Sequence, residues 1–209
     1  MTNDRAKSKC LRSYNRYFGY QIAPLRESVG TSCQMVDPAS NLLVMTTSNI
    51  PAPLQLHEET VQPEWIDYNG HMNVAFYVLA FDHATDAMLE YLRLTHDYKT
   101  KANTTTFVAD MNVTYVQEVK EGDPLRFTTR ILDCDAKRIH FWHEMYHGTE
   151  GYLAATNELL SLHIDLTTRR VGPMAPDVAD WIRKVKTVHA DLPSPSGVGR
   201  LIGMKKQTS

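Results

Sequence analysis

One long amphipathic stretch, residues 73–94, constrains the fold of this chain more than any other feature. Its apolar side chains recur at spacings of three and four, which is the pattern of a helix with one buried stripe. These side chains are Tyr77, Phe81, Ala84, Met88, Tyr91 and Leu92. Such a helix extends for about 30 Å, at about 1.5 Å per residue. An equally extended apolar surface is needed to cover it.

Strand patterns on both sides of this helix supply that surface. One alternating segment precedes it, and four segments rich in Thr, Val, Phe and Tyr follow it, separated by turn sequences such as EGDP, DCDAKR and HGTEG. The predicted strands are residues 54–61, 105–119, 125–132, 139–146 and 152–166, and a short amphipathic helix is predicted over 175–188. This order predicts an α+β domain in which an antiparallel sheet wraps around one long central helix. The two longest strands carry apolar residues on more than one face, so we expect a second copy of the chain to extend the sheet.

The two ends of the chain lack this regularity. Residues 1–53 carry prolines among Ser, Thr and Asn and predict an irregular N-terminal extension. Residues 54–190 form the predicted domain. Residues 191–209 are rich in Pro, Gly, Ser and Lys and predict a loose C-terminal tail.

Composition excludes several classes of function. A formal net charge of -2 and a pI of about 6.5 give no electrostatic case for binding nucleic acid. No apolar run is long enough to span a membrane, and the N-terminus lacks the apolar core of a secretory signal. The 3 cysteines are scattered and show no CxxC spacing. This pattern favours a reducing, cytoplasmic setting.

Residues that can carry chemistry are concentrated in WIDYNGHMN, residues 65–73, where the first strand leads into the helix. Asp67, Asn69, His71 and Asn73 would each, taken singly, be typical of a turn or a helix N-cap. Asn73 alone satisfies the helix end, which leaves Asp67 surplus to capping. The helix N-terminus offers free N–H groups and a positive dipole end to an oxyanion. Because a carboxylate there can attack an acyl carbon or deprotonate an attacking water, the stretch predicts acyl transfer to water.

Three histidines that lie close together in the sequence, His140, His143 and His147, raise the question of a metal site. In a strand, residues 140 and 143 face opposite sides. The chain also has no HExxH motif and no cysteine partner for them. We therefore predict no metal site.

The sequence PEWIDYNGHMNVAFYVLAFDHATD, residues 63–86, resembles the signature of hotdog-fold acyl-CoA thioesterases of the 4-hydroxybenzoyl-CoA type. In that signature an aspartate-containing turn leads into the central helix. The sequence TYVQEVKEGDPLRF, residues 114–127, is similar to the second landmark of the family, and the resemblance covers residues 54–170. Within the superfamily, WIDYNGHMN and LDCDAKRIHFWHEM, residues 132–145, most resemble the betainyl-CoA thioesterases of bacterial carnitine breakdown.

The resemblance implies a hotdog fold, a homodimer or homotetramer with active sites at the subunit interface, and an acyl-CoA substrate with no separate cofactor. It implies that Asp67 is the catalytic carboxylate, acting either as nucleophile or as base. Backbone amides near Asn73 and Val74 would polarise the thioester carbonyl. Lys137 and Arg138 are the candidates for binding the phosphates of coenzyme A, and a solvated hairpin tip is the alternative for them.

A betainyl group carries a trimethylammonium cation, which proteins hold over aromatic faces. Asn69, His71 and Asp110 are further candidates for contacting substrate, and Asp110 would add Coulombic attraction. The aromatic candidates are Trp65, Tyr68, Phe76, Tyr77, Tyr115 and Trp142. Packing in the core is the alternative for most of them. Trp65 is the strongest candidate, because it lies two residues from Asp67 on a turn that does not otherwise demand burial.

Two other functions are open at this point. One is a hotdog enoyl-CoA hydratase, since DYNGH partly resembles the Asp-x-Asn-Pro-x-His motif of R-specific hydratases. Here the histidine comes one position earlier and glycine replaces proline, so Asp67 and His71 would not superpose on that dyad. The other is a binding module for acyl-CoA or quaternary ammonium groups that has lost catalysis.

Overall fold

The computed structural model describes residues 49–203. The predicted N-terminal extension, residues 1–53, therefore lies almost entirely outside the described residues. In chain order the elements are β1 (Glu58–Thr60), η2 (Pro63–Trp65), α2 (Val74–Tyr91), α3 (His96–Ala102), β2 (Thr104–Tyr115), β3 (Pro124–Cys134), β4 (Arg138–His147), β5 (Leu153–Asp165), β6 (Arg170–Val171) and α4 (Pro176–His189). The long helix, the four strands that follow it and the last helix all lie where the sequence predicts them, within a few residues.

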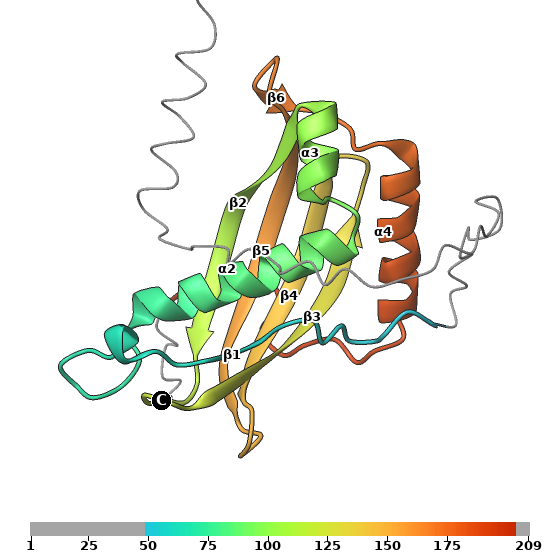
Figure 1. The fold of residues 1–209 in the computed structure, drawn as a ribbon. Coiled ribbons are helices and arrows are strands. Elements are labelled where there is room, and N and C mark those ends of the chain that lie inside the picture. Colours follow the sequence, from blue (N-terminus) through green and yellow to red (C-terminus); the bar gives the residue numbers. More distant parts are fainter. Residues whose placement is uncertain (1–48, 204–209) are drawn as a thin grey trace, which may run out of the picture. The chain divides into compact units, whose positions relative to one another are not determined.

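The sheet is antiparallel, with strand order β1-β3-β4-β5-β2, and β6 pairs with β5. It curves around α2, which crosses one of its faces (Figure 1). This confirms the predicted α+β architecture. The strands do not pair simply in chain order, because β1 occupies the free edge of β3 and β2 crosses over to pair with β5. β2 is consequently an edge strand.

Two apolar clusters fill the space between α2 and the sheet. One surrounds the first half of α2, where Phe81 packs edge to face against Phe127 of β3 with ring centroids 5.9 Å apart. The other joins the second half of α2 to α4, whose Ile182 and Trp181 are buried against it. The indole N–H of Trp181 donates to the carbonyl of Tyr91 at 2.9 Å. The apolar stripe of α2 is therefore buried along its full length.

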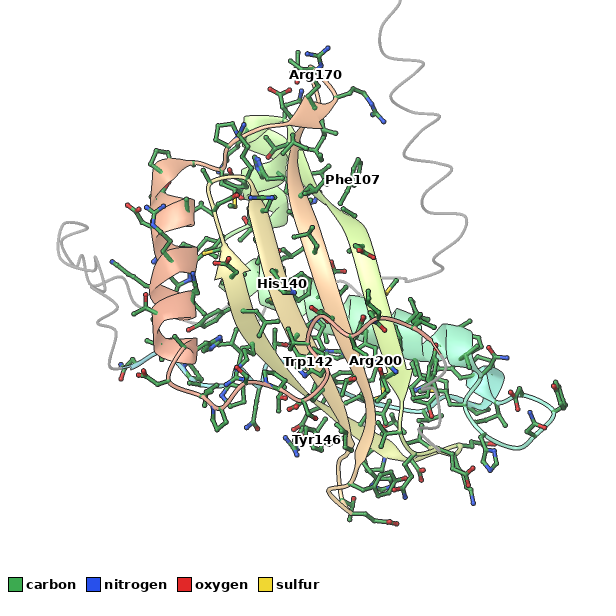
Figure 2. All side chains as sticks on the ribbon, turned by 180° about the vertical axis from the view of Figure 1, so that it is seen from behind. Phe107, His140, Trp142, Tyr146, Arg170 and Arg200 are labelled. Carbon is green, nitrogen blue, oxygen red and sulfur yellow. The ribbon has the colours of Figure 1, made fainter. Side chains whose placement is uncertain are left out.

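Alternation along β4 directs side chains to two faces of the sheet. Phe141 and His143 point to the inner face, where the His143 ring stacks on Phe81 of α2 at 6.0 Å. His140 and Trp142 lie on the outer face (Figure 2). This confirms that residues 140 and 143 face opposite sides. Within residues 49–203, His140, His143 and His147 do not converge on a common point.

The segment after α4 returns across the outer face of the sheet (Figure 2). The carbonyl of Pro193 accepts from the Arg130 guanidinium, the Glu158 carboxylate accepts from the Gly199 amide at 2.8 Å, and the Asn112 side chain donates to the Arg200 carbonyl at 2.8 Å. The described part of the predicted tail, residues 191–203, is therefore hydrogen-bonded to the sheet. The sequence did not reveal this, because hydrogen bonds to backbone groups, rather than a run of apolar side chains, hold the segment in place.

Candidate active site

The WIDYNGHMN turn is a tight hairpin at the start of α2. The Asn73 amide donates to the Trp65 carbonyl at 2.9 Å, and the Asp67 amide donates to the His71 carbonyl at 3.0 Å. Gly70 closes the turn with φ +80, a left-handed conformation that glycine adopts without strain, and its amide donates to the Asp67 carbonyl at 3.0 Å. The backbone around Asp67 is thus fixed by local hydrogen bonds.

The Asn73 side chain caps α2, as the sequence predicts. Its side-chain oxygen accepts from the Ala75 amide at 3.0 Å, and its carbonyl accepts from the Phe76 amide at 2.9 Å. Capping therefore needs nothing from Asp67. The positive end of the helix dipole and the amide of Val74 lie immediately beyond the cap.

The Asp67 residue is half-buried, and its carboxylate accepts a hydrogen bond from the Asn69 amide at 2.8 Å. Within residues 49–203 it has no arginine or lysine partner. A carboxylate with one oxygen bonded locally keeps the other oxygen available to an incoming molecule. Tyr68, next to it, is 97% exposed.

His71 faces a carboxylate that sequence reasoning missed. Its Nε2 lies 3.1 Å from an Oε1 oxygen of Glu118, and the hydroxyl of Tyr152 donates to the Glu118 carbonyl at 3.0 Å. The sequence contained a signal for this contact, since Glu118 belongs to the TYVQEVKEGDPLRF landmark. Its pairing with His71 depends on how the chain returns after β2, and no periodicity shows that.

The aromatic side chains of this region form two pairs. Trp65 stacks on Phe76 with ring centroids 5.7 Å apart and an interplanar angle of 12°, and Tyr77 meets Tyr115 edge to face at 5.2 Å. The Tyr115 hydroxyl donates to the Val74 carbonyl at 3.3 Å. Burial raises the pKa of both tyrosines, so both hydroxyls stay neutral. Trp65 is only 5% exposed, which corrects the expectation that this turn does not demand burial.

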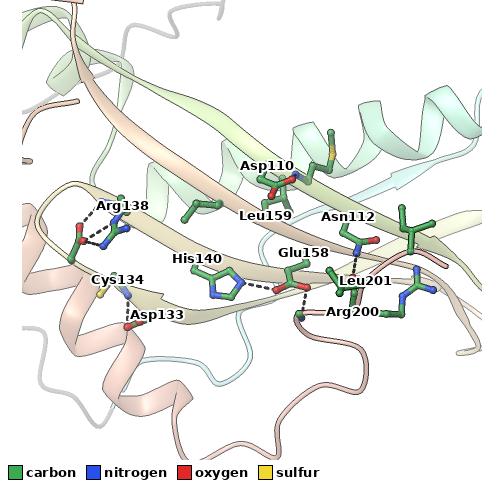
Figure 3. Close-up of a pocket in the computed structure, with 15 residues that line it drawn as sticks. Asp110, Asn112, Asp133, Cys134, Arg138, His140, Glu158, Leu159, Arg200 and Leu201 are labelled. Carbon is green, nitrogen blue, oxygen red and sulfur yellow. Dashed lines mark hydrogen bonds and ion pairs between the residues drawn. The ribbon is translucent and has the colours of Figure 1, made fainter. Parts of the chain in front are cut away.

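Asp110 and Trp142 do not join this group within the protomer. Asp110 lines a cavity of about 670 Å³ on the outer face, between the sheet and the C-terminal segment, together with His140, Glu158 and Arg200 (Figure 3). Trp142 lies on the same outer face, 5% exposed, near Gly197. The sheet therefore separates both residues from α2 and from the turn that leads into it.

Lys137 and Arg138 also lie away from Asp67. Lys137 lies in the exposed turn between β3 and β4, and Arg138 is the first residue of β4, where its guanidinium pairs with Asp135 at 2.6 Å. The WIDYNGHMN turn is instead tied to Val119, five residues before β3 begins, by the hydrogen bond from the Met72 amide at 2.9 Å. The length of β3, about 30 Å at about 3.3 Å per residue, separates the two regions.

Comparison with known proteins identifies the family. Residues 61–182 match the model of the thioesterase-like superfamily. The chain belongs to this superfamily. This thioesterase-like protein is 36% identical over 151 residues to the betainyl-CoA thioesterase of Pseudomonas aeruginosa, covering 72% of this chain and 95% of that one. It is also 31% identical over 154 residues to the L-carnitine dehydrogenase/betainyl-CoA thioesterase of Rhizobium meliloti, covering 74% of this chain and 31% of the longer bifunctional relative.

Solved structures support the same assignment. The thioesterase-like protein aligns with a Staphylococcus aureus protein solved in complex with CoA, with a TM-score of 0.69 and 26% identity, covering 75% of this chain and 99% of that one. It aligns with a candidate thioesterase of Pseudomonas putida with a TM-score of 0.64 and 28% identity, again covering 75% and 99% of the two chains. The predicted hotdog fold is thereby confirmed. Within residues 49–203, none of the helices has the length and apolar character needed to cross a membrane.

Proposed function

We propose that this protein is an acyl-CoA thioesterase that hydrolyses a short acyl-CoA, with betainyl-CoA as the preferred substrate, and that it acts in the cytoplasm without a cofactor. One observation carries the proposal: a carboxylate with no lysine or arginine partner among residues 49–203 is held beside the capped N-terminus of the central helix. The 36% sequence identity to a betainyl-CoA thioesterase, over 72% of this chain, supports betainyl-CoA as the substrate.

The chemistry needs one carboxylate and one electrophilic site. The carbonyl oxygen of the thioester accepts from the Val74 amide at the helix end, where the dipole stabilises the developing negative charge. Asp67 either takes a proton from the attacking water or attacks the carbonyl carbon itself, forming an anhydride that water then cleaves. In both cases the carbon–sulfur bond breaks, the thiolate of coenzyme A takes up a proton, and the free acid is released.

Recognition of the acyl group involves the aromatic side chains around the helix end. Trp65 has one face covered by Phe76, whereas Tyr115 is 46% exposed and Tyr68 is 97% exposed. Exposed ring faces attract a quaternary ammonium by about 0.5–2 kcal/mol each. Of the predicted cation contacts, those from Tyr68 and Tyr115 are therefore the ones best supported within a protomer. Asn69 and His71 line the same turn.

A homodimer completes the proposal. Among the strands of residues 49–203, β2 pairs with β5 alone, and its exposed apolar side chains include Phe107 (48%), Val108 (44%) and Met111 (42%). An apolar edge strand of 12 residues leaves backbone N–H and C=O groups available for pairing with another strand. The β2 strand of a second copy of the chain can pair with it. For Lys137, Arg138, Asp110 or Trp142 to reach the substrate, they would have to belong to a neighbouring subunit.

The test is release of free thiol from betainyl-CoA and acetyl-CoA by wild type, Asp67→Asn and Asp67→Ala. We expect both variants to lose at least about a hundredfold in kcat, the lower range for removing a general base. Asp97→Asn is the matched control, because the Asp97 side chain is 81% exposed on α3 and forms a surface ion pair with Lys101. Wild-type turnover in both Asp67 variants would exclude this carboxylate from catalysis.

The two substrates separate the reaction from its specificity. If acetyl-CoA is hydrolysed as well as betainyl-CoA, the thioesterase assignment stands and the preference for a cation is wrong. Crotonyl-CoA tests the hydratase alternative in the same assay. Hydration of crotonyl-CoA without release of thiol from any substrate would overturn the proposed function.

A further inference from the structure

A second group of chemistry-bearing side chains lies where β1 meets α2. His57 and Glu59 are two residues apart in extended chain, so their side chains point to the same side. On that side they meet His83, which comes from the middle of α2. One nitrogen of each histidine and one oxygen of the carboxylate all lie within 4.8 Å of one another.

The two histidines flank the carboxylate at close range. Nε2 of His57 and Oε1 of Glu59 are buried and lie 3.3 Å apart, and their contact lacks the geometry of a regular hydrogen bond. Buried polar atoms in proteins nearly always have a well-aligned partner. An ion bound by both atoms would supply one.

The spacing fits a metal ion in that position. Ligand atoms at about 2.0–2.1 Å from a tetrahedral Zn²⁺ are about 3.3–3.4 Å from one another. The separation of His57 Nε2 and Glu59 Oε1 is 3.3 Å, and Nδ1 of His83 lies 3.0 Å from the other carboxylate oxygen, Oε2, at hydrogen-bond distance. Two imidazoles and one carboxylate are a ligand set that zinc sites use, with water in the fourth position.

We propose that His57, Glu59 and His83 form a binding site for a divalent transition-metal ion, for which Zn²⁺ is the natural probe. The nitrogen ligands select zinc-like ions over Mg²⁺ and Ca²⁺, which prefer an all-oxygen shell. The side chains of the three residues are 24%, 15% and 21% exposed, so an ion can enter from solvent and keep a bound water.

The position of the site defines its role. β1 consists of 3 residues and pairs with β3, so few backbone hydrogen bonds attach it to the sheet. An ion bound by His57 and Glu59 on one side and by His83 of α2 on the other would link this edge of the sheet to the central helix. His83 comes nine residues after Val74, about 13.5 Å along the helix axis, and this distance places the site away from Asp67. The proposal is therefore independent of the proposed thioesterase activity.

Without an ion, the same three side chains would form a His–Glu–His bridge held by hydrogen bonds alone. The experiment that separates the two uses the full chain, stripped with a chelator and dialysed against Zn²⁺ and, separately, against Co²⁺. We expect one equivalent of metal per chain by elemental analysis and a visible Co²⁺ spectrum of low coordination number. His57→Gln and His83→Gln should each weaken binding at least tenfold, which is about the smallest loss seen when even a residue that merely orients a metal ligand is changed.

The matched control is His140→Gln, which removes a histidine that also bonds a carboxylate, Glu158 at 2.8 Å, but belongs to no three-ligand group among residues 49–203. This variant should bind metal as wild type does. Thermal unfolding with and without Zn²⁺ shows whether each variant is folded and whether the ion stabilises it. Absence of stoichiometric metal in wild type would overturn the proposal, and so would equal metal binding by wild type and by the folded His57→Gln and His83→Gln variants.

Discussion

His143 should make the stability of this domain depend on pH. Its side chain is fully buried between α2 and the sheet. Burial lowers its pKa from 6.5 to about 3, because the charged imidazolium would lose its hydration there. Its two ring nitrogens lie 3.0 Å from the Thr85 hydroxyl and 2.8 Å from the Thr129 hydroxyl. Because the Thr85 hydroxyl donates to the Phe81 carbonyl, it accepts from Nε2 of His143, and the ring is a neutral Nε2–H tautomer.

The direction of the effect follows from the two protonation states. Below pH 6.5 the unfolded chain binds a proton at His143, whereas the folded chain does not do so until about pH 3. Stability from this residue is therefore complete above pH 6.5 and is lost as the pH falls toward 3. Between pH 7.5 and 4.5 the loss amounts to about 2.6 kcal/mol in the free energy of unfolding. This is a large share of the total for a domain of this size.

Urea unfolding at a fixed protein concentration, repeated between pH 7.5 and 4.5, measures this contribution. The perturbation is His143→Gln, whose amide can still donate to Thr85 and accept from Thr129 but does not titrate. The free energy of unfolding of wild type, relative to that of the variant, should fall by about 2–3 kcal/mol from pH 7.5 to 4.5. The reason is that only wild type loses the contribution of the neutral, buried His143. His140→Gln on the outer face is the control. Parallel pH profiles for wild type and His143→Gln would refute the reasoning.

Three further predictions concern the helix end, the core and the edge strand. Asn73→Ala should lower the free energy of unfolding by about 0.5–2 kcal/mol through loss of the cap, as urea unfolding will show, and an unchanged value would contradict the cap. Phe81→Ala should cost about 3–5 kcal/mol in the same assay, because Phe81 is fully buried, and a cost below about 1 kcal/mol would contradict its place in the core. Phe107→Lys should shift the protein from dimer to monomer in sedimentation, whereas Val171→Lys on β6 should not, and a persistent dimer would exclude this edge.

Periodicity predicted the elements whose burial repeats along the chain. The apolar stripe of α2 and the alternating side chains of β3, β4 and β5 pack against one another. The predicted bounds of these elements therefore agree with the observed bounds to within a few residues. α3 was not predicted, because its seven residues, HDYKTKA, bury no side chain completely and show no apolar period. Local and distant bonds define it instead. Thr95 caps it, and the Tyr98 hydroxyl accepts from the Ala175 amide at 3.0 Å.

The site was predictable only where it is local. Asp67 and Asn73 fall within one turn, so cap chemistry predicts that Asn73 caps the helix and that Asp67 is not needed for capping. Asp110 and Trp142 depend on strand register, and in β2 the pairing shifts between Val108 and Asp110. Since a shift of one residue exchanges the two faces of a strand, sequence alone could not place Asp110 on the outer face. The HxE pattern of His57 and Glu59 was visible in the sequence, but the approach of His83 from another element was not.

The proposed active site and the free edge of β2 belong to one surface. Val74 at the helix end is 57% exposed, and Tyr115 and Val116, where β2 ends, are 46% and 55% exposed. The Tyr115 hydroxyl bonds the Val74 carbonyl, so these exposed apolar side chains are contiguous with the end of α2 that would hold the thioester. Stabilising an oxyanion there requires that water be excluded from around it. A second copy paired along β2, as proposed, would cover these residues and exclude water from this end of α2.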